Sequence, residues 1–176
     1  PDTDVCSTWS NVVCSRGYVS SLNLEDKGLI GSIPSQIGDL LRLSSLSFGG
    51  NSLAGSLPSS LWTCTNLVTV TVDRNQLTGP IPSGQLHKVG KLKVFLGQSN
   101  SFSGKIPSVF GFLTRLAALD LRLNSFTGTI PASLGKLLSL ERLGLSDNQL
   151  TGSIPEALCA LSSLDTQIDV TGNGFF

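Results

Sequence analysis

The stretch from Asn124 to Pro131 reads N-S-F-T-G-T-I-P, and its pattern returns along the chain at a nearly constant distance. Further copies begin at Asn51, Asn75, Asn100 and Asn148, and a first copy, in which the Asn is replaced, begins at Lys27. The steps between successive starts are 24, 24, 25, 24 and 24 residues. An apolar frame, L-x-x-L-x-L-x-x-N, precedes the motif, as in L-A-A-L-D-L-R-L-N from Leu116. The chain is therefore built from repeats.

A period of this length with this frame predicts a leucine-rich-repeat solenoid, because each repeat has one apolar face that only a stacked neighbour can bury. Leu119 and Leu121 point to one side of a strand, while Asp120 and Arg122 point to solvent. We expect an α/β solenoid: a right-handed superhelix with a parallel concave sheet, and with short 3₁₀ turns and loops on the convex side, where a Pro begins each turn. The expected strands lie near 22–24, 46–48, 70–72, 94–96, 119–121, 143–145 and 168–170.

The organisation that we expect is an N-terminal cap (1–18), six repeats of about 24 residues (19–164) and a partial seventh repeat without a C-terminal cap (165–176). Trp9, Val12 and Val13 could supply the bulk that covers the open edge of the first strand. At the other end, an uncapped strand with apolar neighbours is open to pairing. We expect either self-association through Ile168 to Phe176 or a missing natural cap.

The repeated Asn can bond backbone groups where the chain leaves each strand, and stacked Asn side chains would form a ladder along the solenoid. The ladder residues are Asn51, Asn75, Asn100, Asn124, Asn148 and Asn173. Lys27, at the start of the ladder, cannot accept hydrogen bonds as an Asn does.

The four cysteines fall into two kinds. Cys6 and Cys14 lie in the cap, where a disulfide would have a clear use and would place the protein in an oxidising compartment; the alternative is two reduced thiols in a cytosolic protein. Cys64 and Cys159 lie four repeats apart, roughly 19 Å at the spacing of strands, which is too far for a disulfide. Cys64 replaces a Leu and is expected to be a small buried apolar residue.

Composition excludes several functions. Twelve Lys and Arg balance twelve Asp and Glu, and no basic stripe is visible, so neither a polyanion nor a nucleic acid is an expected partner. No apolar run reaches the length of a membrane span. Because the sequence contains no Met, we expect that the initiator, and a signal peptide with it, has been removed.

No constellation for catalysis or metal binding is visible. The single His, His87, lies in an irregular insert beside Lys88 and Lys91 and is best read as a solvated loop residue, because no nucleophile accompanies it. The cysteines lack C-x-x-C spacing. We therefore expect no enzyme, no cofactor and no metal.

With the full frame L-x-x-L-x-L-x-x-N-x-L-x-G-x-I-P and the C-x-x-W-x-x-V-x-C of residues 6–14, the chain resembles the plant-type extracellular leucine-rich-repeat family. That family includes receptor-like kinase and co-receptor ectodomains and polygalacturonase-inhibiting proteins. The resemblance implies a second short strand in each repeat, a twisted superhelix and an extracellular or cell-surface location. It also implies binding of peptides, steroids, glycans or proteins on the concave and lateral surfaces. Unlike many members of that family, this sequence has no Asn at the head of an N-x-S/T triplet.

Two functions remain open: a recognition module for a protein, peptide or glycan, and a structural or surface-coat spacer. The outward strand positions favour recognition, because early repeats present small polar residues whereas repeats four and five present an apolar spot, with a polar rim of the kind found around interface centres. The spot comprises Val94, Leu96, Ala118 and Leu123, and the rim comprises Asp73, Arg74, Gln98, Asp120, Arg122 and Arg142.

The alternative reading of the spot is that Leu96 covers the irregular strand at Gly97 and needs no partner. If the site binds a partner, Leu96→Asp and Arg122→Glu should abolish binding and change stability by less than about 1 kcal/mol.

Overall fold

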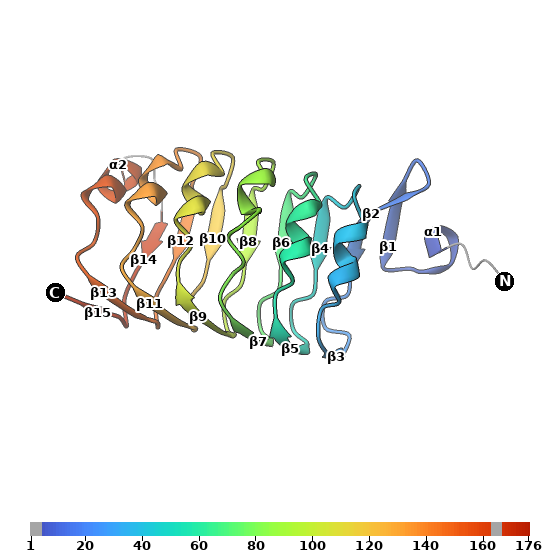
Figure 1. The fold of residues 1–176 in the computed structure, drawn as a ribbon, viewed down its shortest axis with the longest axis horizontal. Helices are drawn as coiled ribbons and strands as arrows, with labels where there is room; N and C mark the ends of the chain where they lie inside the picture. The colour runs from blue at the N-terminus through green and yellow to red at the C-terminus, as the bar shows by residue number, and fades with distance from the viewer. Residues whose placement is uncertain (1–4, 163–166) are drawn as a thin grey trace.

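A computed structural model describes residues 5–162 and 167–176. The chain winds into stacked coils, with its two ends at opposite ends of the stack (Figure 1). In each regular coil, a strand of one sheet is followed by a strand of a second sheet and then by a 3₁₀ helix. The predicted leucine-rich-repeat solenoid is confirmed. The expected boundary between the sixth and seventh repeats, at 164/165, lies outside the described residues.

The larger sheet has eight strands in the order β1-β2-β4-β6-β8-β10-β12-β14. They are β1 (Val12–Ser15), β2 (Tyr18–Asn23), β4 (Ser45–Ser47), β6 (Thr69–Thr71), β8 (Val94–Leu96), β10 (Ala118–Asp120), β12 (Arg142–Gly144) and β14 (Gln167–Asp169). Only β1 and β2 pair antiparallel. The parallel register brings equivalent residues of successive repeats together, as in Phe95 opposite Leu119.

The expected strand at 94–96 coincides with β8, whereas those expected at 46–48, 70–72, 119–121, 143–145 and 168–170 each begin one residue too late. The pairing triplet is centred on the second Leu of the frame, such as Leu46 or Leu119, and ends before the third. The first strand, expected at 22–24, runs from Tyr18 to Asn23 because it pairs with β1 as well as β4.

The second sheet arises from the segment that follows the ladder Asn and has seven strands in the order β15-β13-β11-β9-β7-β5-β3. They are β3 (Ile30–Gly31), β5 (Ser52–Ser56), β7 (Gln76–Gly79), β9 (Ser101–Lys105), β11 (Ser125–Gly128), β13 (Gln149–Gly152) and β15 (Gly174–Phe175). All of these strands pair parallel. The second strand that the family resemblance implied is therefore present.

The remaining side of the coils carries the expected 3₁₀ turns (Figure 1). They are η1 (Ser35–Asp39), η2 (Ser59–Thr63), η3 (Leu86–Lys88), η4 (Ser108–Phe112), η5 (Ala132–Lys136) and η6 (Glu156–Leu158), and η6 leads into α2 (Cys159–Ser162). All except η3 follow a Pro in extended conformation. No helix in residues 5–162 and 167–176 is long and apolar enough to cross a membrane.

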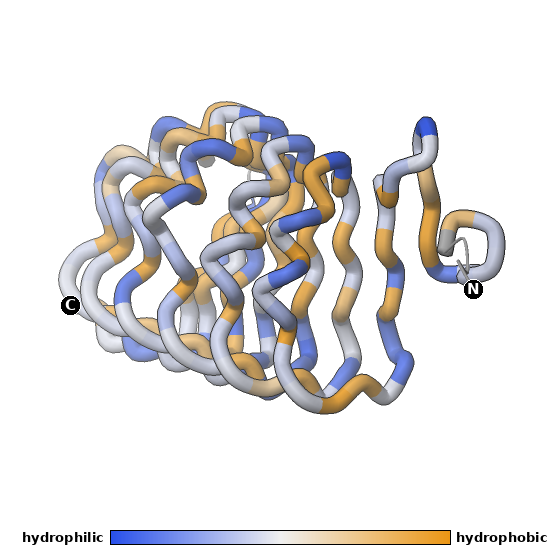
Figure 2. Tube along the Cα trace, turned by 45° about the vertical axis from the view of Figure 1, so that its right-hand side comes forward, coloured by the Kyte–Doolittle hydropathy of each residue, from blue (hydrophilic) through white to orange (hydrophobic). Residues whose placement is uncertain are grey.

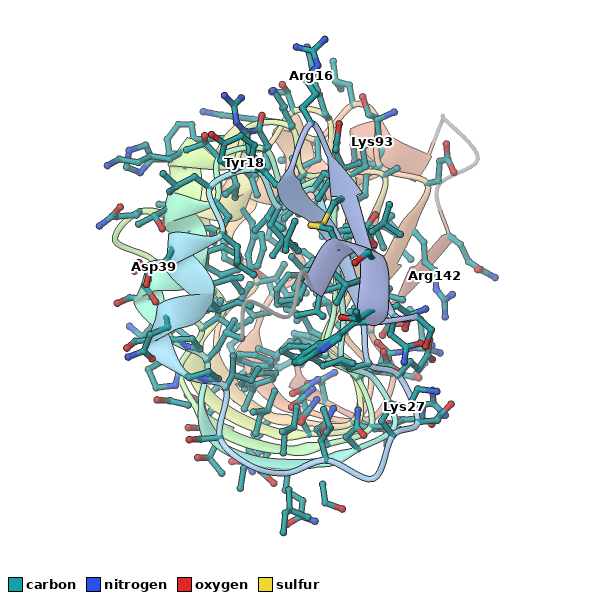
Figure 3. All side chains as sticks on the ribbon, turned by 90° about the vertical axis from the view of Figure 1, so that its right-hand side faces the viewer. Arg16, Tyr18, Lys27, Asp39, Lys93 and Arg142 are labelled. Carbon is teal, nitrogen blue, oxygen red and sulfur yellow. A yellow bond between two sulfur atoms is a disulfide. The ribbon has the colours of Figure 1, made fainter. Side chains whose placement is uncertain are left out.

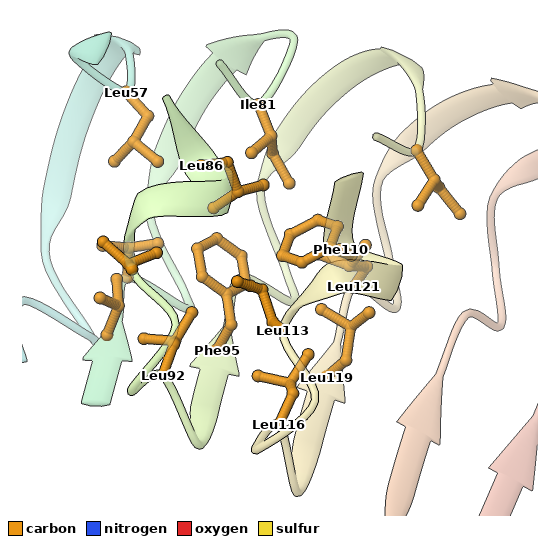
Figure 4. Packing of buried hydrophobic residues seen from close by; sticks show 14 of the residues in the cluster. Leu57, Ile81, Leu86, Leu92, Phe95, Phe110, Leu113, Leu116, Leu119 and Leu121 are labelled. Carbon is orange, nitrogen blue, oxygen red and sulfur yellow. The ribbon is translucent and has the colours of Figure 1, made fainter. Parts of the chain in front are cut away.

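The core between the sheets and the 3₁₀ turns is a continuous stack of Leu, Ile, Val and Phe side chains (Figure 4). Phe95 packs edge to face on Phe110, with ring centroids 5.6 Å apart. Gly97, where the frame expects an inward Leu, faces the rings of Phe95 and Phe102, because a Cβ there would lie 3.0 and 3.4 Å from them. The space inward of Gly97 is thus filled by aromatic rings, and the alternative reading of Leu96 stays a prediction.

The irregular insert before β8 makes room for Trp62. Three other repeats have Gly at the position of Trp62 (Gly38, Gly111 and Gly135), and there the next 3₁₀ turn packs so closely that a Cβ on Gly111 would clash with the carbonyl oxygen of Ser133. Trp62 is fully buried, and its Nε1 donates a hydrogen bond to the carbonyl oxygen of Pro82 at 2.6 Å. The next turn, η3, is correspondingly short.

The ladder side chains bond the backbone of two successive coils. Asn75 Nδ2 donates to the carbonyl oxygens of Val72 and Asp73 in its own repeat and of Phe48 in the previous one, and its Oδ1 accepts from Leu53 N. The same pattern holds at Asn51, Asn100, Asn124, Asn148 and Asn173. The ladder is confirmed, although its bonds run through backbone groups rather than from one Asn to the next.

The cap consists of α1 (Val5–Thr8) and β1, and a disulfide joins Cys6 to Cys14 as predicted. Figure 2 shows the cap as a separate loop and hairpin beyond the first coil. The expectation that Trp9 and Val13 plug the core is wrong, because each is 58% exposed. The cap instead extends the sheet, since β1 pairs with β2.

No disulfide joins Cys64 to Cys159, as their separation predicted. Cys64 is buried as predicted, and burial raises the pKa of its thiol, with a smaller contribution from Asp39. Phe176 is 94% exposed, and self-association through 168–176 stays a prediction. Within the described part of the chain, no three His, Cys, Asp or Glu side chains gather where they could hold a metal ion.

Candidate functional site

Three of the four residues of the expected apolar spot lie side by side on the outward face of the larger sheet. Val94 and Leu96 are on β8, and Ala118 is opposite Val94 on β10. All three are half-buried. We call them the apolar patch. The strand register brings these side chains together, because residues that lie opposite one another on neighbouring strands point to the same face of the sheet.

Leu123 does not join the patch on the strands. It occupies the turn after β10, is 54% exposed and has a φ of 55°. This left-handed conformation is unfavourable for a bulky residue and recurs at Asp26, Arg74, Ser99 and Asp147, the equivalent turns of other repeats. Leu123 therefore presents an exposed apolar side chain at the edge of the face, held in a strained backbone.

Asp120 is completely buried, which contradicts its expected role in a solvent-facing rim. Arg122 reaches its carboxylate through Nε at 2.9 Å and Nη2 at 2.7 Å, and Arg142 Nη2 lies 3.0 Å away. The carboxylate fits because the facing residue of β12 is Gly144, where a Cβ would lie only 2.7 Å from Asp120 Oδ1. The cause of burial is therefore a glycine in the next repeat.

Asp120, Arg122 and Arg142 form what we call the Asp120 cluster, and this cluster changes the expected effect of Arg122→Glu on stability. The hydrogen bond to Asp120 raises the pKa of Arg122, so the guanidinium stays charged. Arg122→Glu would set a second carboxylate beside a buried one, and losing the partner of a buried charge typically costs about 3–5 kcal/mol. Because Arg122 is not an isolated surface residue, we now expect Arg122→Glu to cost more than the value of about 1 kcal/mol that is usual at the surface.

A depression of about 350 Å³ lies beside this cluster. Leu143 and Gly144 line it together with Arg122, Arg142, Gln167 and Asp169. Hydrogen bonds from Thr171 and Ser146 lower the pKa of Asp169, which is therefore ionised at neutral pH. Gly144, Gln167 and Asp169 were not among the residues predicted from the sequence; the available signal was Gly144, a glycine at an outward strand position where other repeats carry a side chain.

Asp73 and Arg74 form a different cluster, near the amino-terminal repeats. Arg74 Nη2 lies 2.9 Å from Glu25, and its Nε lies 3.0 Å from Asp73, whose exposed fraction is only 7%. Asp73 was expected to face solvent, but a Cβ on Gly49 would lie 2.7 Å from it, so a neighbouring glycine again receives the carboxylate. This pair does not line the depression.

Gln98 lies in the outward position between those of Asp73 and Arg122 in successive repeats. Its Oε1 is buried and has no hydrogen-bond partner among the described residues. The structure therefore gathers the apolar patch, Gln98 and the Asp120 cluster on β8 to β14, and leaves Asp73 and Arg74 apart.

The chain is similar to known leucine-rich-repeat proteins. The family model "Leucine Rich Repeat" matches residues 42–64, 115–137 and 139–161, and no curated protein sequence matches the chain. Among solved structures, Pollen Receptor Kinase 3 is 31% identical with a TM-score of 0.82, covering 98% of this chain and 82% of that one. A plant ice-binding protein is 31% identical with a TM-score of 0.86, covering 97% and 55%.

A third similar structure is the Arabidopsis receptor kinase HAESA in complex with the peptide hormone IDA and the co-receptor SERK1. It is 35% identical with a TM-score of 0.85; the match covers 97% of this chain and 28% of that one, so the chain spans less than a third of that relative. Sequence motif, fold and relatives agree, and the chain belongs to the plant-type extracellular leucine-rich-repeat family.

Proposed function

We propose that the protein is a non-enzymatic recognition module, secreted or at the cell surface, that binds a protein or peptide on the outward face of β8 to β14. The observation that carries the proposal is the continuity of the apolar patch with the Asp120 cluster and the depression beside it. The match to a receptor solved with a peptide hormone supports the same class of ligand. The Cys6–Cys14 disulfide supports an oxidising, extracellular location.

The chemistry of this face suits a peptide. Val94, Leu96 and Ala118 offer apolar contact, and the unpaired Oε1 of Gln98 can accept a hydrogen bond once its side chain adjusts. Arg142 keeps donors free, because its side chain is 47% exposed and makes one ion pair. An apolar centre beside fixed polar groups is the usual arrangement of an interface in which a few residues supply most of the binding energy.

The experiment is a pull-down from the source organism with wild type, Leu96→Asp and Leu123→Asp. Ser45→Asp is the matched control, because Ser45 is also half-buried on the outward face but lies on β4. We expect both Leu variants to lose a partner that wild type and the control retain. Thermal unfolding of each variant checks that the fold is unchanged. Recovery of the same partners by all four proteins would exclude this face.

A second candidate function is binding to an ordered extended surface such as ice, because the ice-binding relative has the same fold. The observation that favours it is the second sheet, whose strands present exposed hydroxyls at Thr78, Ser101, Thr127 and Thr151, with Thr78 opposite Ser101 on the neighbouring strand. Measuring ice recrystallisation with wild type and Thr127→Lys separates the two functions, because the peptide-binding face does not include Thr127.

A further inference from the structure

Asn173 is the one ladder residue that is followed by a glycine, whereas the other ladder residues are followed by Ser or Gln. An Asn-Gly pair loses its side-chain amide more readily than other Asn pairs, because Gly has no Cβ to hinder attack of its backbone nitrogen on the preceding side chain. Asn173 therefore combines the structural role of a ladder residue with a chemical weakness.

The reaction of such a pair needs no partner other than water. The backbone nitrogen of Gly174 bonds to Cγ of Asn173, the Cγ–Nδ2 bond breaks, and the amide leaves as ammonia together with the proton of the Gly174 N–H. Water then opens the cyclic imide at either of its carbonyl carbons, which leaves aspartate or isoaspartate at position 173. Both products carry a carboxylate, which only accepts hydrogen bonds, where Asn173 had donors.

The ladder hydrogen bonds hold Asn173 in an unreactive position. Its Oδ1 accepts from Leu150 N at 3.0 Å. Its Nδ2 donates at 2.9 to 3.1 Å to the carbonyl oxygens of Leu145, Val170 and Thr171. Because both ends of the amide are held, Cγ can turn toward the nitrogen of Gly174 only when these bonds break. The bonds that build the solenoid thus also protect this amide.

The coil that contains Asn173 spans 167–176, and we call it the β14–β15 coil. Within the described part of the chain, β14 pairs with β12 alone and β15 pairs with β13 alone. The apolar side chains of Ile168, Val170 and Phe175 are only partly buried against the core. A coil of a solenoid is stabilised by its neighbours, so the β14–β15 coil opens more readily than the coils in the middle of the stack.

The ladder runs along the corner at which each coil passes from the larger sheet to the second sheet. Figure 3, a view along the stack, shows this corner at Lys27, which holds the ladder position of the first coil, with Arg142 of the larger sheet above it. Asn173 lies between β14 and β15 in the same way. Losing its donated bonds would therefore loosen both strands, including Gln167 and Asp169, which line the depression beside the Asp120 cluster.

We infer that Asn173 is a deamidation site whose reaction is held back by the ladder and released when the β14–β15 coil opens. An aspartate there keeps the bond from Leu150 N, but its carboxylate faces the carbonyl oxygens that had accepted from Nδ2, so closure of the coil becomes unfavourable. An isoaspartate also lengthens the backbone by a methylene group and disturbs the register of β15 with β13. The inference does not depend on the proposed function, because the reaction requires only this chain and water.

The test measures the rate of amide loss at each ladder Asn by mass spectrometry of peptides from the full chain. The protein is incubated at neutral pH, either native or unfolded in guanidinium chloride. We expect Asn173 to react faster than the other ladder residues in both conditions. Its rate should be about tenfold or more higher in the unfolded chain, because the native rate follows the small population of the open coil. Equal rates at Asn173 in the two conditions would overturn the inference.

Three variants separate the chemistry from the opening of the coil. Gly174→Ala should slow the loss several-fold in both conditions, and it fits, because its Cβ would lie 3.4 Å from the carbonyl oxygen of Leu150. Val170→Ala should raise the native rate several-fold and leave the unfolded rate unchanged, because it weakens packing only in the folded coil. Val72→Ala, at the equivalent position of a central coil, is the matched control and should leave both rates at Asn173 unchanged.

Two results from these variants would contradict the inference: an unchanged rate in Gly174→Ala, or equal acceleration of the native rate by Val72→Ala and Val170→Ala. Hydrogen exchange of the deamidated product tests the structural consequence. Leu145 N donates to the carbonyl oxygen of Asp169 at 2.7 Å in the closed coil, so its exchange should be several-fold faster after deamidation. Unchanged exchange at Leu145 would show that the coil closes despite the carboxylate, which would also overturn the inference.

Discussion

Asn148→Asp is a near-isosteric change that tests whether the ladder stabilises the solenoid through its donated hydrogen bonds. Asn148 is 9% exposed, and its Nδ2 donates to the carbonyl oxygens of Leu121, Leu145 and Ser146 at 3.0 to 3.1 Å. Its Oδ1 accepts from Phe126 N at 3.0 Å, a bond that a carboxylate would retain. The substitution therefore replaces three donated bonds with contacts between oxygen atoms.

Nδ2 carries two hydrogens, so one of them is shared between two carbonyl oxygens; at about 1 kcal/mol for each lost donor, the loss amounts to about 2 kcal/mol. The cost of placing a carboxylate in a buried site adds to this value. Burial among carbonyl groups raises the pKa of the new carboxyl above its value of about 4 in the unfolded chain. Because the folded pKa is the higher one, the added cost is present at neutral pH and disappears as pH falls below the unfolded pKa.

The measurement is the urea midpoint at pH 7 and at about pH 4, near the unfolded pKa of Asp, with Asn23→Asp as the matched control. Asn23 is exposed, and its side chain accepts one bond, from Glu25 N, which an Asp can also accept. We expect the control to stay within about 0.5 kcal/mol of wild type. Equal effects of the two variants, or a larger loss for Asn148→Asp at the lower pH, would refute the reasoning.

Two further predictions concern the Asp120 cluster and the cap. Gly144→Ala should lower stability by about 3 kcal/mol or more, as when a buried ion pair is broken, because the new Cβ would lie 2.7 Å from Asp120 Oδ1; Gly90→Ala, with nothing within 4 Å of its Cβ, is the control for thermal unfolding. Reduction of the Cys6–Cys14 disulfide, whose partners are 8 residues apart, should destabilise the cap by about 2.5 kcal/mol in the chain-entropy model. Alkylation of both thiols in the native, unreduced protein would contradict the second prediction.

The period and the apolar frame were sufficient to predict the stacking, the 3₁₀ turns and the Asn ladder, because each depends on residues within one repeat. Burial of Asp120 and Asp73 could not be predicted in the same way. It depends on Gly144 and Gly49 in neighbouring repeats, which lie against the carboxylates, and for Asp120 also on Arg142, which reaches it from the next strand. The one-residue offset of the strands has a simpler cause: the frame shows which residues point inward but not which residue centres the hydrogen-bonded triplet.

A surface pocket that Arg16, Arg42 and Lys91 help to line was missed for a related reason. Arg16, Arg42 and Lys91 lie in three different repeats or in the cap, and each is unremarkable in its own segment. Only the stacking of the repeats brings these three cations to the same pocket as Tyr18. In a solenoid, surface sites are therefore predicted by comparing equivalent positions of successive repeats. The comparison has to include the turns that enter the sheet as well as the strands.

The placement of the two tryptophans gives the chain two built-in optical reporters. Trp62 is fully enclosed between coils in the middle of the stack, whereas Trp9 is 58% exposed in the cap. Emission from the enclosed indole should be blue-shifted and protected from a soluble quencher, and emission from the cap indole should be red-shifted and readily quenched. Selective excitation or quenching can therefore follow fraying of the cap and melting of the central coils as separate signals, without any added label.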